Sequence, residues 1–190
     1  MSLAEQKRRL RPEILARRGL RGGARRAQAA LVRAAWLLER KAPTGAVALF
    51  AGFGDELDPM PLARRLARQG RQVLLPVVVR RGEPLRFRAW RPGTRMRRAA
   101  FGIREPAHRA PAPVPAIVLV PLVGIDNNGT RLGHGGGYYD RTIAGWRAHG
   151  RRPLLVGLAF EAQRVARLPR GRHDRRLDML VSEAATRRFR

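Results

Sequence analysis

The residues best suited to chemistry lie in one stretch, Gly124–Arg141, which reads GIDNNGTRLGHGGGYYDR. Its central part is dense in glycine, at Gly133, Gly135, Gly136 and Gly137. Glycine adopts positive φ and lets the main chain approach a ligand closely. The stretch follows an apolar run and opens a predicted helix, so its amides would face a concavity that suits phosphate. Arg131 and Arg141 flank the glycines with forked donors for phosphate oxygens.

Known phosphate motifs fit this stretch poorly. No Gly-Lys-Ser/Thr follows the glycines, as a Walker loop requires, and no acidic residue ends a strand about 20 residues further on, as a Rossmann fingerprint requires. The alternative is a plain glycine turn between a strand and a helix. Such a turn does not need Arg131, two consecutive tyrosines and Asp140 in one run. The composition of the stretch therefore favours a ligand-binding loop.

The elements that position this loop alternate between strand and helix. Apolar runs bounded by turn residues predict strands at Gly45–Ala51, Gln72–Val79, Ala116–Val123, Leu154–Phe160 and Asp178–Ser182, with Leu85–Trp90 as an edge strand. Residues 91–115 are rich in proline and arginine and predict a long surface connection. Strands that are apolar throughout indicate an α/β fold, with a mostly parallel central sheet flanked by helices in three layers.

Helices are predicted from apolar periodicity and from start signals. Two arginine- and alanine-rich segments, about 2–18 and 24–40, are separated by Gly19, Gly22 and Gly23, and the second carries a stripe of Leu31, Ala35 and Leu38. Asp58 followed by Pro59 predicts a further helix start, with Pro59 at the first helical position. The helix after the glycines would bury Tyr139, Ile143 and Trp146.

Length and composition bound the class of protein. The chain has 190 residues, and we expect a single domain over 1–190 with a helical segment at about 1–40. It contains no cysteine, which excludes disulfides, thiolate catalysis and cysteine zinc sites. No secretory signal or membrane-spanning run is visible, so we expect a cytoplasmic protein without a membrane partner.

The charge is unusual: 40 basic residues stand against 14 acidic ones, for a formal net charge of +26. One interpretation is nucleic-acid binding, since arginine binds phosphate backbones. The other is a compositional bias, because the arginines run from Arg8 to Arg190 without a preferred block and aromatic residues make up only 6%. We favour the bias and do not expect a nucleic-acid partner. Either way, such a field attracts anionic substrates.

Several motifs, taken together, resemble the 5-formyltetrahydrofolate cyclo-ligase family. The run RLGHGGGYYDR at residues 131–141 resembles the family signature RLGxGxGYYDR. Other matches follow in the same order along the chain: Lys7–Arg11, Asp55–Asp58, residues 101–103 with Glu105 and Pro106, Leu158–Gln163, Leu168 with Pro169, and His173 with Asp174. Pro59 departs from the family pattern, which usually has threonine, and His134 fills a variable slot. The resemblance covers nearly the whole chain.

The resemblance implies a reaction and its participants. A member of this family cyclises 5-formyltetrahydrofolate to 5,10-methenyltetrahydrofolate, while ATP becomes ADP and phosphate. ATP would phosphorylate the formyl oxygen to give an iminophosphate, and the neighbouring N10 would then close the ring. ATP as co-substrate and Mg²⁺ are therefore implied, with a formylfolate substrate that can carry a polyglutamate tail. We expect a monomer or weak dimer. The rival from the same class is another α/β enzyme that uses this loop for a different phosphorylated substrate.

The resemblance also assigns roles to single residues. Catalysis would fall to Arg131 and Tyr138. ATP would be held by Lys7, Arg11, Arg131, Leu132, Gly133, His134, Gly135, Gly136, Gly137, Tyr138 and Tyr139. The folate would contact Ala51, Glu56 and Tyr138, with the Glu56 carboxylate accepting pterin N–H groups. Asp140 and Asp174 would bind Mg²⁺, for which carboxylates are suitable ligands. Simpler readings remain for three of these residues: an exposed lysine for Lys7, a carboxylate at a helix start for Asp140, and a surface ion pair for Asp174.

Overall fold

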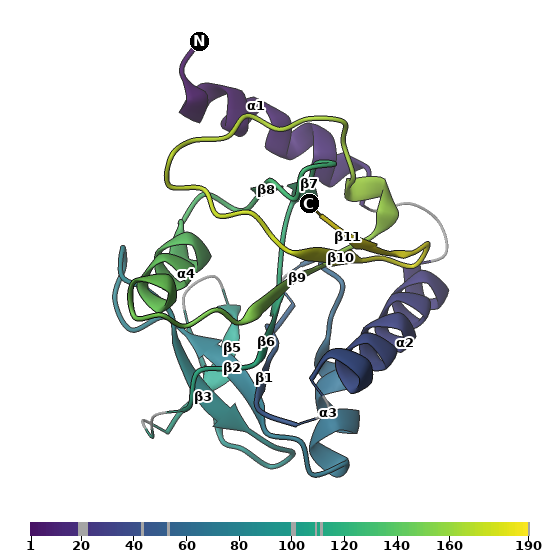
Figure 1. Ribbon diagram of the computed structural model, residues 1–190, viewed down its shortest axis with the longest axis vertical. Coiled ribbons are helices and arrows are strands. Elements are labelled where there is room, and N and C mark those ends of the chain that lie inside the picture. Colours follow the sequence, from purple (N-terminus) through teal and green to yellow (C-terminus); the bar gives the residue numbers. More distant parts are fainter. Residues whose placement is uncertain are drawn as a thin grey trace.

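The computed structural model describes residues 1–18, 23–42, 44–52, 54–99, 102–108, 110 and 112–189. Within this part of the chain a seven-stranded sheet has the order β11-β10-β9-β6-β1-β2-β3 (Figure 1). Its inner strands are parallel: β10 (Met179–Val181), β9 (Leu154–Leu158), β6 (Ile117–Val120), β1 (Val47–Ala48) and β2 (Val73–Val77). The edge strands β11 (Thr186–Arg188) and β3 (Arg86–Trp90) are antiparallel to their neighbours. The predicted mostly parallel sheet is confirmed.

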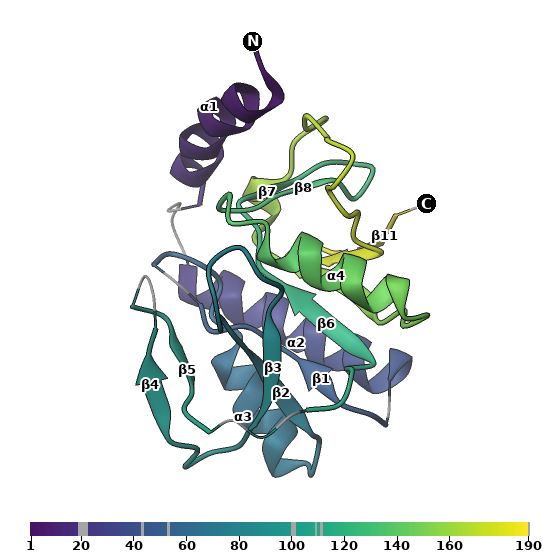
Figure 2. The ribbon, with the colours of Figure 1, turned by 90° about the vertical axis from the view of Figure 1, so that its left-hand side faces the viewer.

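Helices cover both faces of this sheet. Figure 2 shows α2 (Gly23–Lys41) and α3 (Met60–Arg68) behind the sheet and α4 (Tyr138–Ala148) in front of it. The first helix, α1 (Leu3–Ala16), lies beyond one end of the sheet, near the short strands β7 (Gly124–Ile125) and β8 (Arg131–Leu132). A 3₁₀ turn, η2 (Glu161–Gln163), follows β9. The arrangement is the expected three-layer α/β/α architecture.

The sheet has one large apolar cluster on each face, because successive side chains of a strand point to opposite faces. In β6, Ile117 and Leu119 pack in the cluster that contains the buried residues of α2 and α3. Val118 and Val120 pack instead with Ile143 of α4. All four side chains of β6 are buried, which explains why its sequence is apolar throughout rather than alternating.

Local signals explain where the helices begin. Ser2 and Glu5 form a capping box at the start of α1. The stripe predicted for the second helix is confirmed, since Leu31, Ala35 and Leu38 are all buried. The prediction for Pro59 is off by one position, because Pro59 occupies the N-cap position and α3 begins at Met60. The Asp58 carboxylate accepts a hydrogen bond from the Met60 amide at 3.0 Å.

The predicted surface connection over residues 91–115 is wrong in its middle part. Strands β4 (Met96–Arg98) and β5 (Arg104–Pro106) form an antiparallel hairpin there. The Glu105 carboxylate anchors the hairpin to the sheet, since it pairs with Arg97 at 2.5 Å and accepts from the Val78 amide at 3.1 Å. This contact joins residues that are far apart in the sequence, so the local pattern of apolar residues cannot predict it. Gly19 and Gly22 of the predicted helix break, and Phe101 of a family motif, lie outside the described residues.

Some predicted strands form sheet hydrogen bonds over fewer residues than their apolar runs contain. Gly45–Ala51 contributes only Val47–Ala48 to the sheet, although Leu49 and Phe50 beyond them remain buried. None of the described helices combines the length and the apolar character needed to cross a bilayer.

Candidate functional site

The predicted site residues gather beyond the carboxyl ends of the parallel strands, where ligands bind in open α/β sheets. After β6 the chain forms the β7–β8 hairpin and then the glycine loop, Gly133–Gly137, which leads into α4. The sequence had predicted only a loop between the strand and the glycines. The hairpin matters because it carries Arg131 into the site, and α1 lies against the same hairpin (Figure 1).

The glycine loop has a main chain that other residues could hardly adopt. Gly135 has φ +102° and Gly137 has φ +65°. A Cβ at Gly136 would lie 2.7 Å from the Tyr138 ring. Gly137 caps α4 without any side-chain hydrogen bond to the helix amides. The amino end of α4 is therefore open to an anion, with the partial positive charge that such an end carries.

Arg131 is a buried cation next to the glycine loop, with 5% of its side chain exposed. Its Nη2 lies 3.0 Å from Asp140 Oδ1, and its Nη1 donates to the Arg175 carbonyl at 2.6 Å. Asp140 Oδ1 also accepts from the Arg175 amide at 2.8 Å. These contacts tie the β7–β8 hairpin, the first turn of α4 and the 170–176 segment together. Arg131 has five N–H donors, so further donors remain for a ligand.

Helix α1 brings two more cations to the glycine loop. Ile14 anchors the helix in a small apolar cluster with Val123, Leu132 and Leu168. Helix α1 lies so close to β7 that a Cβ at Gly124 would be 2.8 Å from the Ile14 side chain. From this helix Arg11 donates to the Gly133 carbonyl at 2.8 Å.

Lys7, one turn earlier, forms an ion pair with Asp174. Its side chain is 16% exposed, so the simple reading of an exposed lysine is wrong. Burial acts to raise the pKa of Asp174. The Lys7 ammonium, the Gly171 amide and the charge of Arg131 outweigh burial and lower the pKa. Asp174 and Asp140 thus lie in the field of the same arginine.

Glu56 reaches the site from the loop after β1, and only 7% of its side chain is exposed. Its Oε1 lies 2.8 Å from His134 Nε2, which joins two residues 78 positions apart. The histidine in the variable slot of the signature therefore has a definite place: it covers Glu56, with about half of its own surface exposed. Ala51 is half-buried just beyond β1, at the same edge of the sheet.

The two tyrosines that open α4 differ in their surroundings. Both pack partly against the apolar cluster beneath α4. The ring of Tyr138 lies under the Arg141 guanidinium, whose centre is 5.2 Å from the ring centroid, and Arg141 donates to the Gly136 carbonyl at 2.6 Å. The Tyr139 hydroxyl is buried without a hydrogen-bond partner among the described residues. Burial raises the pKa of Tyr139, and the negative charge of Glu56 raises it further.

Sequence reasoning gave no site role to two residues at this end of the sheet, Arg18 and Gln163, although Gln163 closes one of the family motifs. Arg18 is buried, lies near Glu56 and Gln163, and donates to the Leu122 carbonyl at 3.0 Å. Burial lowers the pKa of Arg18, while the charge of Glu56 opposes this effect. Gln163 donates to the same carbonyl at 2.8 Å. Among so many arginines, nothing in the sequence marked this one as buried.

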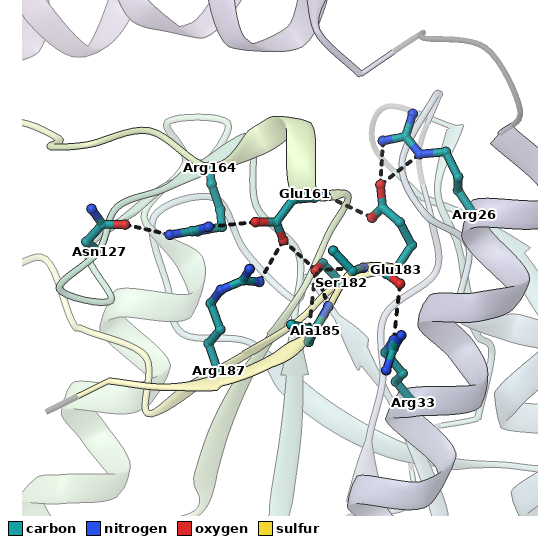
Figure 3. A network of polar contacts seen from close by, with 10 residues as sticks. Arg26, Arg33, Asn127, Glu161, Arg164, Ser182, Glu183, Ala185 and Arg187 are labelled. Atoms are coloured by element: carbon teal, nitrogen blue, oxygen red, sulfur yellow. Dashed lines mark hydrogen bonds and ion pairs between the residues drawn. The ribbon is translucent and has the colours of Figure 1, made fainter.

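A network of arginines and glutamates holds the turn that carries Gln163 (Figure 3). Glu161 is its centre and accepts from Ser182, Arg164 and Arg187 at 2.6, 2.6 and 2.7 Å. Burial acts to raise the pKa of Glu161, but these hydrogen bonds and charges lower it. Arg26 of α2 joins the network through Glu183 at 2.5 Å. The network fixes the chain beyond β9 and β10 at the same edge as the site.

The donor groups suit the phosphates of a nucleotide with Mg²⁺. Among the described residues, no three His, Cys, Asp or Glu side chains are grouped to enclose a metal ion by themselves. Mg²⁺ commonly takes only one or two carboxylates and completes its shell with waters and substrate phosphates. Asp140 and Asp174 are two carboxylates and so fit that pattern; Asp174 also forms the ion pair with Lys7. Leu132 is buried in the α1 cluster, so its part in binding would come from its main chain.

Comparison with known proteins decides the family. The sequence model of the 5-formyltetrahydrofolate cyclo-ligase family matches residues 3–183. The chain belongs to this family. A 5-formyltetrahydrofolate cyclo-ligase of Haemophilus influenzae is 37% identical over 145 residues, which cover 71% of this chain and 74% of that protein. One of Escherichia coli K12 is 37% identical over 129 residues, or 65% and 69% of the two chains.

Solved structures agree with the cyclo-ligase assignment. The structure of Aquifex aeolicus 5,10-methenyltetrahydrofolate synthetase has a TM-score of 0.79 and 30% identity, and it covers 97% of this chain and 93% of its own. A 5,10-methenyltetrahydrofolate synthetase of Mycoplasma pneumoniae has a TM-score of 0.70 at 21% identity, over 93% and 98% of the chains, and supports the fold alone. The family resemblance seen in the sequence, the α/β fold and the assignment to a family of enzymes are confirmed.

Proposed function

We propose that this chain cyclises 5-formyltetrahydrofolate to 5,10-methenyltetrahydrofolate, with ATP converted to ADP and phosphate. Membership of the cyclo-ligase family supports the reaction. One structural observation supports its ATP dependence: Lys7, Arg11 and Arg131 converge on a glycine loop that opens a helix. This arrangement is suited to hold a polyphosphate, because cationic donors and helix amides meet at one place.

The reaction needs alignment more than it needs reactive side chains. The formyl oxygen is a poor leaving group, so it first attacks the γ-phosphorus of ATP, and the bond from that phosphorus to the ADP oxygen breaks. N10 then attacks the activated carbon of this iminophosphate. A new C–N bond closes the ring, phosphate departs with the former formyl oxygen, and the N10 proton is released. The site must therefore hold the γ-phosphate against the formyl group and exclude water.

Residues around the glycine loop would hold ATP. Lys7 and Arg11 provide cations from α1, the loop provides main-chain amides, and Tyr139 provides a buried hydroxyl. Arg131 would neutralise charge on the transferring phosphoryl group from its buried position. Asp140 and Asp174 would hold Mg²⁺, whose positive charge would offset the negative charge of the phosphates.

Residues on the Glu56 side would hold the folate. The Glu56 carboxylate would accept pterin N–H groups, because a carboxylate offers two acceptor oxygens side by side. Ala51 lies beside this loop, and the Tyr138 ring would stack on an aromatic part of the substrate. Glu56 reaches the glycine loop through His134, so the two substrates would meet where the reaction requires.

The wider setting that we propose follows the same assignment. The enzyme would work in the cytoplasm as a monomer or weak dimer, on formylfolate with or without a polyglutamate tail. Nucleic acid and membrane would not be partners, and the arginine field would attract anionic substrates.

Near-ultraviolet absorbance tests the proposal directly, because the conjugated methenyl product absorbs where the substrate does not. Purified protein with 5-formyltetrahydrofolate, ATP and Mg²⁺ should give an increase that requires all three. Arg131→Ala should abolish the increase, whereas Arg152→Ala, which removes an exposed arginine beyond α4, should leave it unchanged. A folded protein that binds ATP without any increase would show that the loop serves another phosphorylated substrate. Tight, salt-sensitive binding to nucleic acid without turnover would instead favour the nucleic-acid reading.

A further inference from the structure

A cavity lies at the end of the sheet where the parallel strands begin, opposite the end that carries the glycine loop. It has a volume of about 800 Å³. It is placed where β2 begins at Val73 and β3 ends at Trp90, which pair with each other. The parallel strands begin at this edge and end at the proposed active site, so the two regions are separated by the length of the sheet.

The lining of this cavity is strongly basic. Four of the described residues that line it carry cationic or titratable nitrogen groups: Arg71, Arg91, Arg95 and His108. None of the described lining residues is aspartate or glutamate. Arg91 and Arg95 are exposed at the rim, and a turn closed by Thr94 joins them. An uncompensated cluster of this kind attracts a multiply charged oxyanion, for which guanidinium groups provide paired donors.

Two buried nitrogen atoms on the lining residues lack partners. Arg71 Nη2 donates to the Ala42 carbonyl at 2.5 Å, but Arg71 Nε is buried without a partner in the described part of the chain. His108 Nε2 lies 2.8 Å from the Ala89 carbonyl and must donate to it, which leaves Nδ1 buried and equally unpartnered within the residues described. Buried polar groups usually have partners. Seven side-chain atoms of the described residues are exceptions, and two of them belong to residues that line this cavity.

The cavity also offers apolar surface. Val73, Ala89 and Trp90 line it beside the basic groups. Its volume lies within the range of small-molecule sites, roughly 300–1,000 Å³. An apolar wall with an aromatic ring, next to three guanidinium groups, matches a molecule that has both a flat organic part and a phosphate.

From this combination we propose that the cavity binds a phosphorylated organic molecule of nucleotide size. The phosphate would lie between Arg91 and Arg95, with Arg71 and His108 beside it, and the organic part would lie along the apolar wall that Ala89 and the exposed edge of Trp90 form. A phosphate monoester carries about two negative charges and three acceptor oxygens, which a single carboxylate does not. This site would give part of the arginine excess a function that is separate from the cyclisation site.

Fluorescence of Trp90 can report on binding in the full chain. The chain has three tryptophans, Trp36, Trp90 and Trp146, so Trp36→Phe with Trp146→Phe leaves Trp90 as the reporter. The probes are the four common ribonucleoside 5′-monophosphates, each with its unphosphorylated nucleoside as the control. At least one monophosphate should change the emission in a saturable way, and its nucleoside should bind at least about tenfold more weakly. The signal should persist in Arg131→Ala, because the other edge of the sheet is not involved.

Matched double variants separate a site from a general charge effect. Arg91→Ala with Arg95→Ala should weaken binding at least about tenfold and leave folate cyclisation unchanged. Arg80→Ala with Arg81→Ala removes the same charge from exposed positions outside the lining and should change binding less than about twofold. Equal weakening in both pairs, no saturable change with any monophosphate, or equally tight binding of citrate would overturn the proposal.

Discussion

Replacing Gly137 with alanine is expected to destabilise the protein and to weaken ATP binding together. Gly137 has φ +65° at the start of α4, where an L-residue is disfavoured by about 1–2 kcal/mol. The new Cβ would also lie 2.8 Å from Arg141 Nη1. The arginine must shift and give up its exposed hydrogen bond to the Gly136 carbonyl, which adds less than about 1 kcal/mol. The total is about 1–3 kcal/mol of lost stability.

A glycine-to-alanine substitution eight residues later should change the stability in the opposite direction. Gly145 lies inside α4 and has no atom within 4 Å of an added Cβ. Alanine restricts the unfolded chain and favours the helix, so Gly145→Ala should stabilise the protein by about 0.5–1 kcal/mol. The two variants should therefore differ by about 1.5–4 kcal/mol, although each adds a single methyl group at or in the same helix.

Urea denaturation of the two variants and the parent measures this difference, and ADP titration of the folded proteins measures the effect on the loop. Gly137→Ala should bind ADP more weakly, while Gly145→Ala should bind it like the parent. A Gly137→Ala protein as stable as the parent would refute the loop conformation. A loss of stability in both variants would refute the reasoning about backbone conformation.

Two further predictions concern charge. Lys7→Met should raise the KM for ATP by about tenfold or more, because a charged hydrogen bond to phosphate is lost. Lys41 is the only other lysine and is exposed, so Lys41→Met should leave the KM unchanged. Equal effects of the two variants in steady-state kinetics would contradict the assignment of Lys7 to ATP binding. Because the pKa of Glu161 is lowered in the folded state from 4.5, the unfolded chain binds that proton more readily, and stability should fall as the pH drops below about 4.5. Glu161→Gln should flatten that fall in denaturation experiments across acid pH, and Glu13→Gln on the exposed side of α1 should leave it as steep as in the parent.

The strands were accessible to sequence reasoning because each buried strand is apolar in itself. Ile117–Val120 is buried on both faces, so its run of apolar residues is visible without any knowledge of its neighbours. The β4–β5 hairpin was not accessible, since its anchor is the contact of Glu105 with the Val78 amide, 27 positions away. The burial of Arg18 was hidden for the same reason: its partner is a carbonyl 104 positions away.

The sequence by itself determined the family, the α/β class and the glycine loop, because these depend on residue types at fixed local spacing. Glycines that need positive φ and an apolar run before a helix are properties of neighbouring residues. Only the tertiary structure decided which charges meet: Lys7 with Asp174, Glu56 with His134, and Arg131 with the segment that carries Arg175. In a chain with 40 basic residues, almost any acidic group could have had several partners. The packing of α1 and the β7–β8 hairpin at the carboxyl edge of the sheet selected the pairs that form.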